Sequence, residues 1–223
     1  MIQIAIDGPG GAGKSTVSKA VAAKLGIVYV DTGALYRTIG LYVKSKGISP
    51  KDAEAVSACL PDVSIEIRYI DGKQCVFLNG VDHGDDIRTP EMSMYASAVS
   101  AIPAVRAFLL DTQRDIARKN SVIMDGRDIG TVILPNAQLK IYLTASEECR
   151  ARRRYDELIA KGQDVKFEDV LAEMNQRDKQ DSSREVAPAT AAEDAILLDN
   201  TDLDFEGTVE AIVKLAKGTG LVD

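Results

Sequence analysis

Cysteine and histidine are scarce in this chain, and the few present are not arranged for chemistry. Cys59, Cys75 and Cys149 lie too far apart in the sequence to form a paired metal site. We therefore expect free thiols in a reducing compartment. The single histidine, His83, lies in an acidic loop, where we expect a solvated side chain. The chain thus offers no Ser-His or Cys-His arrangement for covalent catalysis.

Long apolar runs and an excess of positive charge are also missing. No apolar run approaches the length that spans a bilayer, so we expect no membrane partner. Acidic residues outnumber basic ones by 34 to 27, and the net charge is −7. This balance argues against a protein that coats nucleic acid. Locally concentrated arginines in such an acidic chain favour small phosphate ligands.

A glycine-rich run near the start of the chain is its most informative feature. Residues 8–15 read GPGGAGKS, the phosphate-binding pattern G-x-x-x-x-G-K-[S/T], between an apolar segment and a helical pattern. Glycines let backbone N–H groups surround phosphate oxygens, and Lys14 can reach between the β- and γ-phosphates. Ser15 offers a hydroxyl to Mg²⁺, so we expect a nucleoside triphosphate site. The residues expected to bind ATP are Gly8, Pro9, Gly10, Gly11, Ala12, Gly13, Lys14, Ser15 and Thr16.

Short apolar runs alternate with helical patterns, which is typical of an α/β fold with a doubly wound parallel sheet. We expect one domain over residues 1–223. Its five core strands are predicted at residues 2–6, 27–30, 122–124, 139–143 and 196–198. Aspartates follow four of these strands, at the sheet edge where ligands bind in open α/β folds. They are Asp7, Asp31, Asp125 and Asp199.

Two segments depart from this alternation. The first carries Asp71-Gly72 and Asn79-Gly80, which are strong hairpin turn signals. It predicts a small antiparallel β lobe, at about residues 61–98, inserted between the second and third core strands. The second, at about residues 148–186, combines arginine clusters with a polar stretch at 160–164. It predicts a mobile helical lid that excludes water from the reaction.

The arginines of the predicted lid fall at helical spacing. Arg150, Arg153 and Arg154 share one helix face at i, i+3 and i+4. If the helix continues through residues 182–183, a second helix face carries Arg177, Asp181 and Arg184, at i, i+4 and i+7. A solvated helix face is the ordinary explanation of such charge runs. Like charges at this spacing repel unless an anion lies between them, however, and a transferred phosphate would be such an anion.

The segment after the second core strand, residues 31–37, reads DTGALYR. Asp31 and Thr32 are typical of a helix start, which places Arg37 about a turn and a half into the helix. A guanidinium at this sheet edge can bind a phosphate with two N–H donors. The alternative is an ordinary surface arginine.

The segment after the third core strand, residues 125–131, reads DGRDIGT. Asp125 lies where a carboxylate can orient Mg²⁺ through water. Arg127 and Asp128 place a cation and an acceptor on the same short loop. The alternative is an internal salt bridge or a tight surface turn.

These segments together resemble the bacterial cytidylate kinases, a family of phosphate-loop nucleoside monophosphate kinases. The matching segments are residues 6–16, 31–37, 125–131, 177–178 with Asp181, and 184–188, whereas Gln180 and Ser182 stand where the family pattern has arginines. The resemblance runs essentially from end to end. It implies a kinase core with a monophosphate-binding lobe and an arginine-bearing lid. It also implies Mg²⁺-dependent transfer of the γ-phosphoryl group of ATP to CMP or dCMP, giving ADP and CDP or dCDP.

The resemblance further implies a role for individual residues. The CMP site it implies consists of Thr32, Arg37, Ser97, Arg106, Arg127, Asp128, Arg177, Asp181 and Arg184. Within this set, the monophosphate is assigned to Arg37, Arg127 and Arg184, the sugar to Arg177 and Asp181, and the base to Ser97, Arg106 and Asp128. The implied catalytic residues are Lys14, Arg127, Arg153 and Arg184. The metal ligand is Ser15, with Asp125 acting through water, and no general base is assigned.

Two other functions stay open. One is a small-molecule kinase of the same fold that acts on a different monophosphate or on a small hydroxylated acceptor. The other is a GTP-binding switch protein, although no Asn/Thr-Lys-x-Asp element follows an apolar run. We expect a monomer whose partners are its small-molecule substrates. Because the phosphate-binding pattern begins at Gly8, we expect no targeting peptide and a cytoplasmic location.

Overall fold

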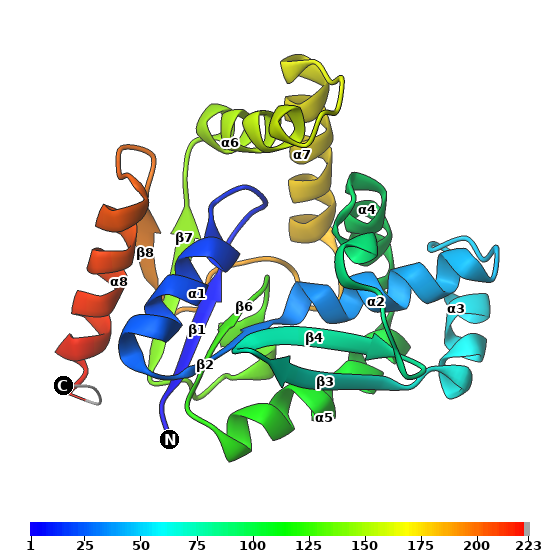
Figure 1. Ribbon diagram of the computed structural model, residues 1–223, viewed down its shortest axis with the longest axis horizontal. Coiled ribbons are helices and arrows are strands. Elements are labelled where there is room, and N and C mark those ends of the chain that lie inside the picture. Colours follow the sequence, from blue (N-terminus) through cyan, green and yellow to red (C-terminus); the bar gives the residue numbers. More distant parts are fainter. Residues whose placement is uncertain (221–223) are drawn as a thin grey trace. The chain divides into compact units, whose positions relative to one another are not determined.

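The computed structural model describes residues 1–220, and its chain divides into two compact units (Figure 1). The first unit consists of residues 1–29 and the described part of 119–223, and the second unit is Val30–Arg118. Each unit has a hydrophobic core of its own. The predicted bounds of the β lobe and the lid stay predictions.

A five-stranded sheet forms the centre of the architecture, in the order β2-β6-β1-β7-β8. Its strands are β1 (Gln3–Asp7), β2 (Val28–Asp31), β6 (Val122–Asp125), β7 (Leu139–Thr144) and β8 (Ile196–Asp199). β1 pairs in parallel with both β6 and β7, and β7 pairs in parallel with β8. Each strand lies within one residue of its predicted range. The predicted α/β class with a five-stranded parallel sheet is confirmed.

The first unit buries β1, β6 and β7 beneath aliphatic side chains, whereas β8 is largely exposed. Its helices are α1 (Lys14–Leu25), the π-helix η3 (Ile129–Ile133), α6 (Glu147–Ala160), α7 (Phe167–Ser183) and α8 (Phe205–Gly218). Ile4 and Ile6 of β1 are fully buried, and they share a core with Val21 of α1 and Ile212 of α8. Burying each such side chain contributes about 1.5–3 kcal/mol. This core holds the carboxyl end of β1 in place, where the phosphate-binding pattern begins.

The helix α7 is shorter than the sequence pattern suggested at its C-terminal end. It includes Ser182 and Ser183 and ends there, because the backbone of Arg184 is extended, with φ −68° and ψ 144°. Arg177 and Asp181 therefore share a helix face as predicted. Arg184 is placed by the segment that follows the helix instead.

The second unit contains the inserted β lobe. Its elements are α2 (Thr32–Ser45), α3 (Ala53–Cys59), η1 (Leu60–Asp62), β3 (Ile65–Ile70), β4 (Lys73–Leu78), β5 (Val81–Asp82), η2 (Gly84–Arg88), α4 (Pro90–Val99) and α5 (Pro103–Lys119). The three strands pair antiparallel in the order β3-β4-β5. Asp71 and Gly72 both have positive φ, 50° and 74°, as a tight hairpin turn requires. The predicted small antiparallel sheet is confirmed.

Helices α2, α4 and α5 supply the core of the second unit. Leu35, Val99, Val105 and Leu109 are fully buried within it. No single helix in residues 1–220 is long and apolar enough to cross a membrane. The bent pair α4–α5, with an angle of 100° between its helices, passes that test of length and composition as a pair.

The three cysteines are free, as predicted. His83 precedes η2, and its Nδ1 lies 3.8 Å from the carboxylate of Asp86. The predicted loop setting of this histidine is therefore confirmed.

Candidate functional site

The glycine-rich pattern forms the loop between β1 and α1, and local sterics explain its glycines. At Gly8 the backbone φ is 145°, and a Cβ atom there would lie 2.0 Å from the carbonyl oxygen of Leu143. A side chain at this position would therefore displace the loop from the end of β7. Gly13 has φ 85° and directly precedes α1. These two glycines let the chain turn sharply from the strand into the helix.

Lys14 is the first residue of α1 and is buried. Its Nζ donates to the carbonyl oxygen of Pro9 at 2.7 Å, so the lysine crosses its own loop. Burial lowers the pKa of Lys14 well below its ordinary value, and the nearby positive charge of Arg127 adds to this effect. A phosphate bound in the loop would favour the charged form of the lysine.

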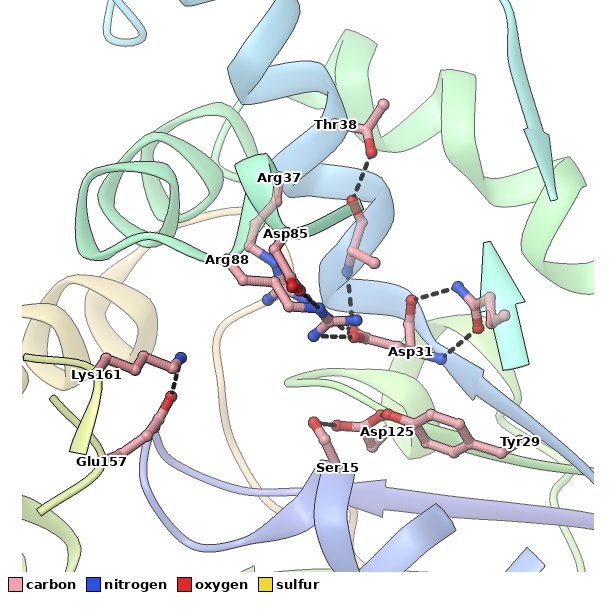
Figure 2. A network of polar contacts seen from close by, with 12 residues as sticks. Ser15, Tyr29, Asp31, Arg37, Thr38, Asp85, Arg88, Asp125, Glu157 and Lys161 are labelled. Atoms are coloured by element: carbon pink, nitrogen blue, oxygen red, sulfur yellow. Dashed lines mark hydrogen bonds and ion pairs between the residues drawn. The ribbon is translucent and has the colours of Figure 1, made fainter. Parts of the chain in front are cut away.

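The carboxylate of Asp125, at the end of β6, accepts two hydrogen bonds (Figure 2). Ser15 Oγ donates to its Oδ2 at 2.7 Å, and the hydroxyl of Tyr29 donates to its Oδ1 at 2.8 Å. A hydroxyl and a carboxylate thus stand side by side where α1 begins. Oxygen donors of this kind are the ligands that Mg²⁺ prefers. The donor set therefore fits a magnesium ion that accompanies a nucleotide.

Asp7, at the end of β1, fastens the loop that follows β6. Its two carboxylate oxygens accept the backbone N–H groups of Ile129 at 2.7 Å and Gly130 at 2.8 Å. Burial raises the pKa of Asp7 to about 6, helped by the charge of Asp128 and opposed by the two N–H groups and by Lys14. This carboxylate thus determines the position of the segment that carries Arg127 and Asp128.

The raised pKa of Asp7 predicts a pH-dependent stability. The folded protein binds this proton more tightly than the unfolded chain, so stability falls as pH rises from about 3.8 to about 6. The loss amounts to about 3 kcal/mol by pH 7. Urea unfolding at pH 4.5 and 7 should therefore show a smaller decline in Asp7→Asn than in the unaltered protein. Asp199→Asn is the control and should not reduce the decline, because hydrogen bonds from Thr201 lower the pKa of Asp199 rather than raise it. An equal decline in Asp7→Asn would contradict the assignment.

Five of the predicted CMP residues lie together in the first unit. They are Arg127, Asp128, Arg177, Asp181 and Arg184. Arg127 Nε donates to Asp181 Oδ2 at 3.1 Å, and Arg177 Nε lies 3.9 Å from the same oxygen. Arg184 Nη2 lies 3.8 Å from Asp128 Oδ1. The loop after β6 is therefore joined to α7 and to the segment that follows it by ion pairs.

A cavity of about 380 Å³ opens beside these pairs in the first unit. Arg127 and Asp181 line it, together with Pro9 of the phosphate-binding loop and Tyr142 of β7. The cavity is large enough for phosphate groups. It lies at the carboxyl end of the parallel strands, as expected for a ligand site in an open α/β sheet.

Each arginine of the α6 cluster has a partner within the protein. Arg153 donates from Nη1 to Asn200 Oδ1 at 3.0 Å and from Nη2 to its carbonyl oxygen at 2.9 Å. Arg154 pairs with Glu157 at 2.8 Å. Arg150 is buried and pairs with Asp178 of α7. Arg150 and Arg154 thus have carboxylate partners within the protein, whereas Arg153 is held by a neutral amide, and its role toward a transferred phosphate stays a prediction.

Asp31 organises the predicted phosphate-binding segment of the second unit (Figure 2). Its Oδ1 caps α2 by accepting the backbone N–H of Ala34 at 2.9 Å. Arg37 Nη2 donates to both carboxylate oxygens, at 3.2 and 2.9 Å, and Arg88 Nη1 lies 3.4 Å from Oδ2. Only 17% of the Arg37 side chain is exposed. The guanidinium of Arg37 is therefore fixed by Asp31, unlike that of an ordinary surface arginine.

The remaining CMP residues also belong to the second unit, and all three are buried. Thr32 is the first residue of α2, and Ser97 lies in α4. Arg106 of α5 donates to the carbonyl oxygen of Ser100 at 3.1 Å, and its guanidinium lies 5.6 Å from the ring centre of Tyr36. The roles assigned to these side chains stay predictions.

Sequence reasoning missed several residues of these networks. Asn200 directly follows β8, and its Nδ2 donates to the carbonyl oxygen of Ala12 at 3.1 Å. The rule that pointed to the strand-end aspartates could have found it. Arg88 ends η2, within the predicted range of the β lobe, and no recognisable pattern marks it. Asp178 follows Arg177 in a matching segment but received no role.

Comparisons with known proteins agree on one family. The sequence model of the cytidylate kinases matches residues 4–218. Cytidylate kinase of Caldicellulosiruptor bescii is 51% identical over 96% of this chain and 95% of its own length. That of Caldanaerobacter subterraneus is 52% identical over 97% of each chain. Among solved structures, an uncharacterized protein from Eubacterium ventriosum aligns with a TM-score of 0.53 at 14% identity. That alignment covers 97% of this chain and 99% of the other, and it concerns the fold alone.

The family match covers both units and includes every residue that sequence reasoning assigned to nucleotide binding. Its span also contains the phosphate-binding loop and the cavity described above. The chain belongs to the cytidylate kinase family.

Proposed function

We propose that the protein transfers the γ-phosphoryl group of ATP to CMP or dCMP, giving ADP and CDP or dCDP. The observation that carries this proposal is a phosphate-binding loop, with Lys14 at the start of α1, in a chain that belongs to the cytidylate kinase family. Phosphoryl transfer needs positioning and charge neutralisation more than a covalent nucleophile. Buried and partly buried arginines of both units supply that charge.

The donor end of the reaction is the loop between β1 and α1. Its backbone N–H groups bind phosphate oxygens, and Lys14 moves from Pro9 to the β- and γ-phosphates. Ser15 would hold Mg²⁺ directly and Asp125 would hold it through water. The metal would supply positive charge that neutralises the negative charge developing during transfer. Lys14 stabilises the same charge from the protein side.

The acceptor end uses arginines to hold the monophosphate. We assign this role to Arg37 of the second unit and to Arg127 and Arg184 of the first. A guanidinium presents paired N–H donors that match phosphate oxygens, which orients the attacking oxygen of CMP. Arg177 and Asp181 bind the sugar. Arg153 is the further cation assigned to the transferred group.

The segment from Arg150 to Arg184 should respond to bound nucleotide. If Arg153, Arg154 and Arg184 converge when both substrates are present, amide hydrogen exchange there should slow sharply with a bisubstrate analogue. Helix α8 serves as the internal control and should be unaffected. Mass spectrometry of peptides from both regions measures this directly. Equal exchange with and without the analogue would show a fixed surface helix.

A coupled assay with ATP and a panel of monophosphates tests the function itself. Fast turnover with CMP and dCMP, and slow turnover with AMP, GMP and UMP, is the expected result. Preference for another acceptor would identify a different small-molecule kinase of the same fold. Nucleotide-dependent binding of a protein partner without turnover would instead indicate a switch protein.

We also propose that the protein acts as a monomer in the cytoplasm. Both substrates are small soluble nucleotides, and one chain supplies every residue assigned to them. Mass determination by light scattering, with and without substrates, tests the monomeric state.

A further inference from the structure

Asp178 lies next to Arg177 in one of the matching segments, but the proposed reaction gives it no role. We propose that its carboxylate competes with the triphosphate for the phosphate-binding loop, so that ATP must displace it. Asp178 would then be a residue that determines the affinity for the phosphate donor. The proposal rests on the proposed function in one respect, namely that the loop binds ATP.

The first observation is a hydrogen bond between α7 and the loop. The backbone N–H of Gly10 donates to Asp178 Oδ1 at 3.2 Å. Backbone N–H groups of such loops are the donors that phosphate oxygens accept. Here the carboxylate of Asp178, in α7, accepts from one of these N–H groups. An anionic oxygen of the protein thus occupies an N–H donor of the kind that a phosphate oxygen accepts.

The second observation is that Arg150 fastens Asp178 to the same loop residue. Arg150 Nη1 donates to the carbonyl oxygen of Gly10 at 3.0 Å and also to Asp178 Oδ2. Its Nε donates to the carbonyl oxygen of Ala145 at 3.0 Å, which holds the buried guanidinium in place. Gly10, Arg150 and Asp178 therefore form a closed ring of hydrogen bonds, which we call the loop latch.

Packing around the loop latch leaves little room for a shift of the loop itself. At Gly11 a Cβ atom would lie 2.7 Å from Met174 Cε and 2.8 Å from the carbonyl oxygen of Arg150. Both α6 and α7 thus contact the loop closely. Asp178 has more freedom, because 21% of its side chain is exposed and it lines the 380 Å³ cavity. Displacement is therefore easier for Asp178 than for the loop.

The charges favour exchange of Asp178 for a phosphate. A triphosphate carries several negative charges and would repel a carboxylate at hydrogen-bond distance from the same N–H. Once displaced, Asp178 releases Arg150 Nη1, which lies 3.0 Å from the loop and becomes available to a phosphate oxygen. Binding therefore exchanges one charge-assisted hydrogen bond for another. Without the competing carboxylate, the nucleotide binds to a loop whose donor is already available.

Two substitutions test this competition. Asp178→Asn keeps the size of the side chain and removes its charge, and Asp178→Ala removes the acceptor altogether. We expect the Kd for ATP, measured by calorimetry, to fall on the order of tenfold in both variants, because the lost hydrogen bond involves a charged group. Glu173→Gln is the matched control: it removes one charge from the exposed surface of α7. An unchanged or higher Kd in the Asp178 variants, or an equal fall in Glu173→Gln, would overturn the proposal.

A measurement on the unaltered protein does not depend on how the variants fold. The ¹³C resonance of the Asp178 carboxylate should move when ADP or inorganic tripolyphosphate is added. A resonance that stays in place at saturating ligand would also overturn the proposal. Because neither probe involves CMP, failure of the proposed acceptor in the kinase assay is distinguishable from failure of the loop latch.

Discussion

Lys14→Ala is expected to lower kcat by about 10²- to 10³-fold or more, the range typical of a lost electrostatic contact to the transition state. Lys14 is the first residue of α1, directly after the loop, and its Nζ lies 2.7 Å from the carbonyl oxygen of Pro9. In the proposed reaction this cation stabilises the negative charge that develops between the β- and γ-phosphates. Alanine provides nothing in its place.

The fold should tolerate this substitution. Burial disfavours the charged form of Lys14, so we do not expect its removal to take a stabilising charge from the core. Steady-state kinetics with ATP and CMP, together with thermal unfolding, measure both effects. Lys24→Ala, in the last turn of the same helix, is the control and should retain normal turnover. Near-normal turnover in a folded Lys14→Ala protein would contradict the role assigned to the loop.

Discrimination between cytosine and uracil is the second large effect we expect. Cytosine has an exocyclic amine next to the acceptors N3 and O2, whereas uracil has a carbonyl and an N–H at the corresponding positions. We propose that Asp128 accepts from the amine while Ser97 and Arg106 donate to N3 and O2. Each mispaired buried group costs about 1–3 kcal/mol. Two mismatches predict a preference for CMP over UMP on the order of 10² or greater in kcat/KM.

Asp128→Ala tests which residue enforces this preference. Activity with CMP should fall more than activity with UMP, so the ratio of the two kcat/KM values should move toward one. Asp128 is also 3.8 Å from Arg184, so some loss with both substrates is expected. Asp202→Ala, an exposed carboxylate of the first unit, is the control and should leave the ratio unchanged. Comparable kcat/KM values for CMP and UMP in the unaltered protein would favour a general pyrimidine monophosphate kinase instead.

Local sequence patterns predicted much of the fold because short-range physics determines those features. Continuous apolar runs identified the five core strands: β1, β6 and β7 are buried as such runs predict, whereas β8 carries the same pattern but is largely exposed. Asp31 identified the start of α2, because its side chain accepts a backbone N–H three residues later. Asp71-Gly72 identified the hairpin through the positive φ that both residues adopt. Each of these features depends on neighbours a few residues apart.

The order of the strands and the folding of α6 and α7 over the loop decided the remaining contacts. Gly10 and Asp178 are separated by 168 residues, yet one donates to the other. Arg153 pairs with Asn200 across 47 residues, and Asp7 holds Ile129 and Gly130 across 122 and 123 residues. Helical spacing showed which arginines share a face but not which acceptors lie opposite them. The sequence by itself therefore determined the secondary structure, the turns and the phosphate-binding loop. Only the tertiary structure decided the partner of each buried charge and the raised pKa of Asp7, because both depend on groups that folding brings together from distant segments.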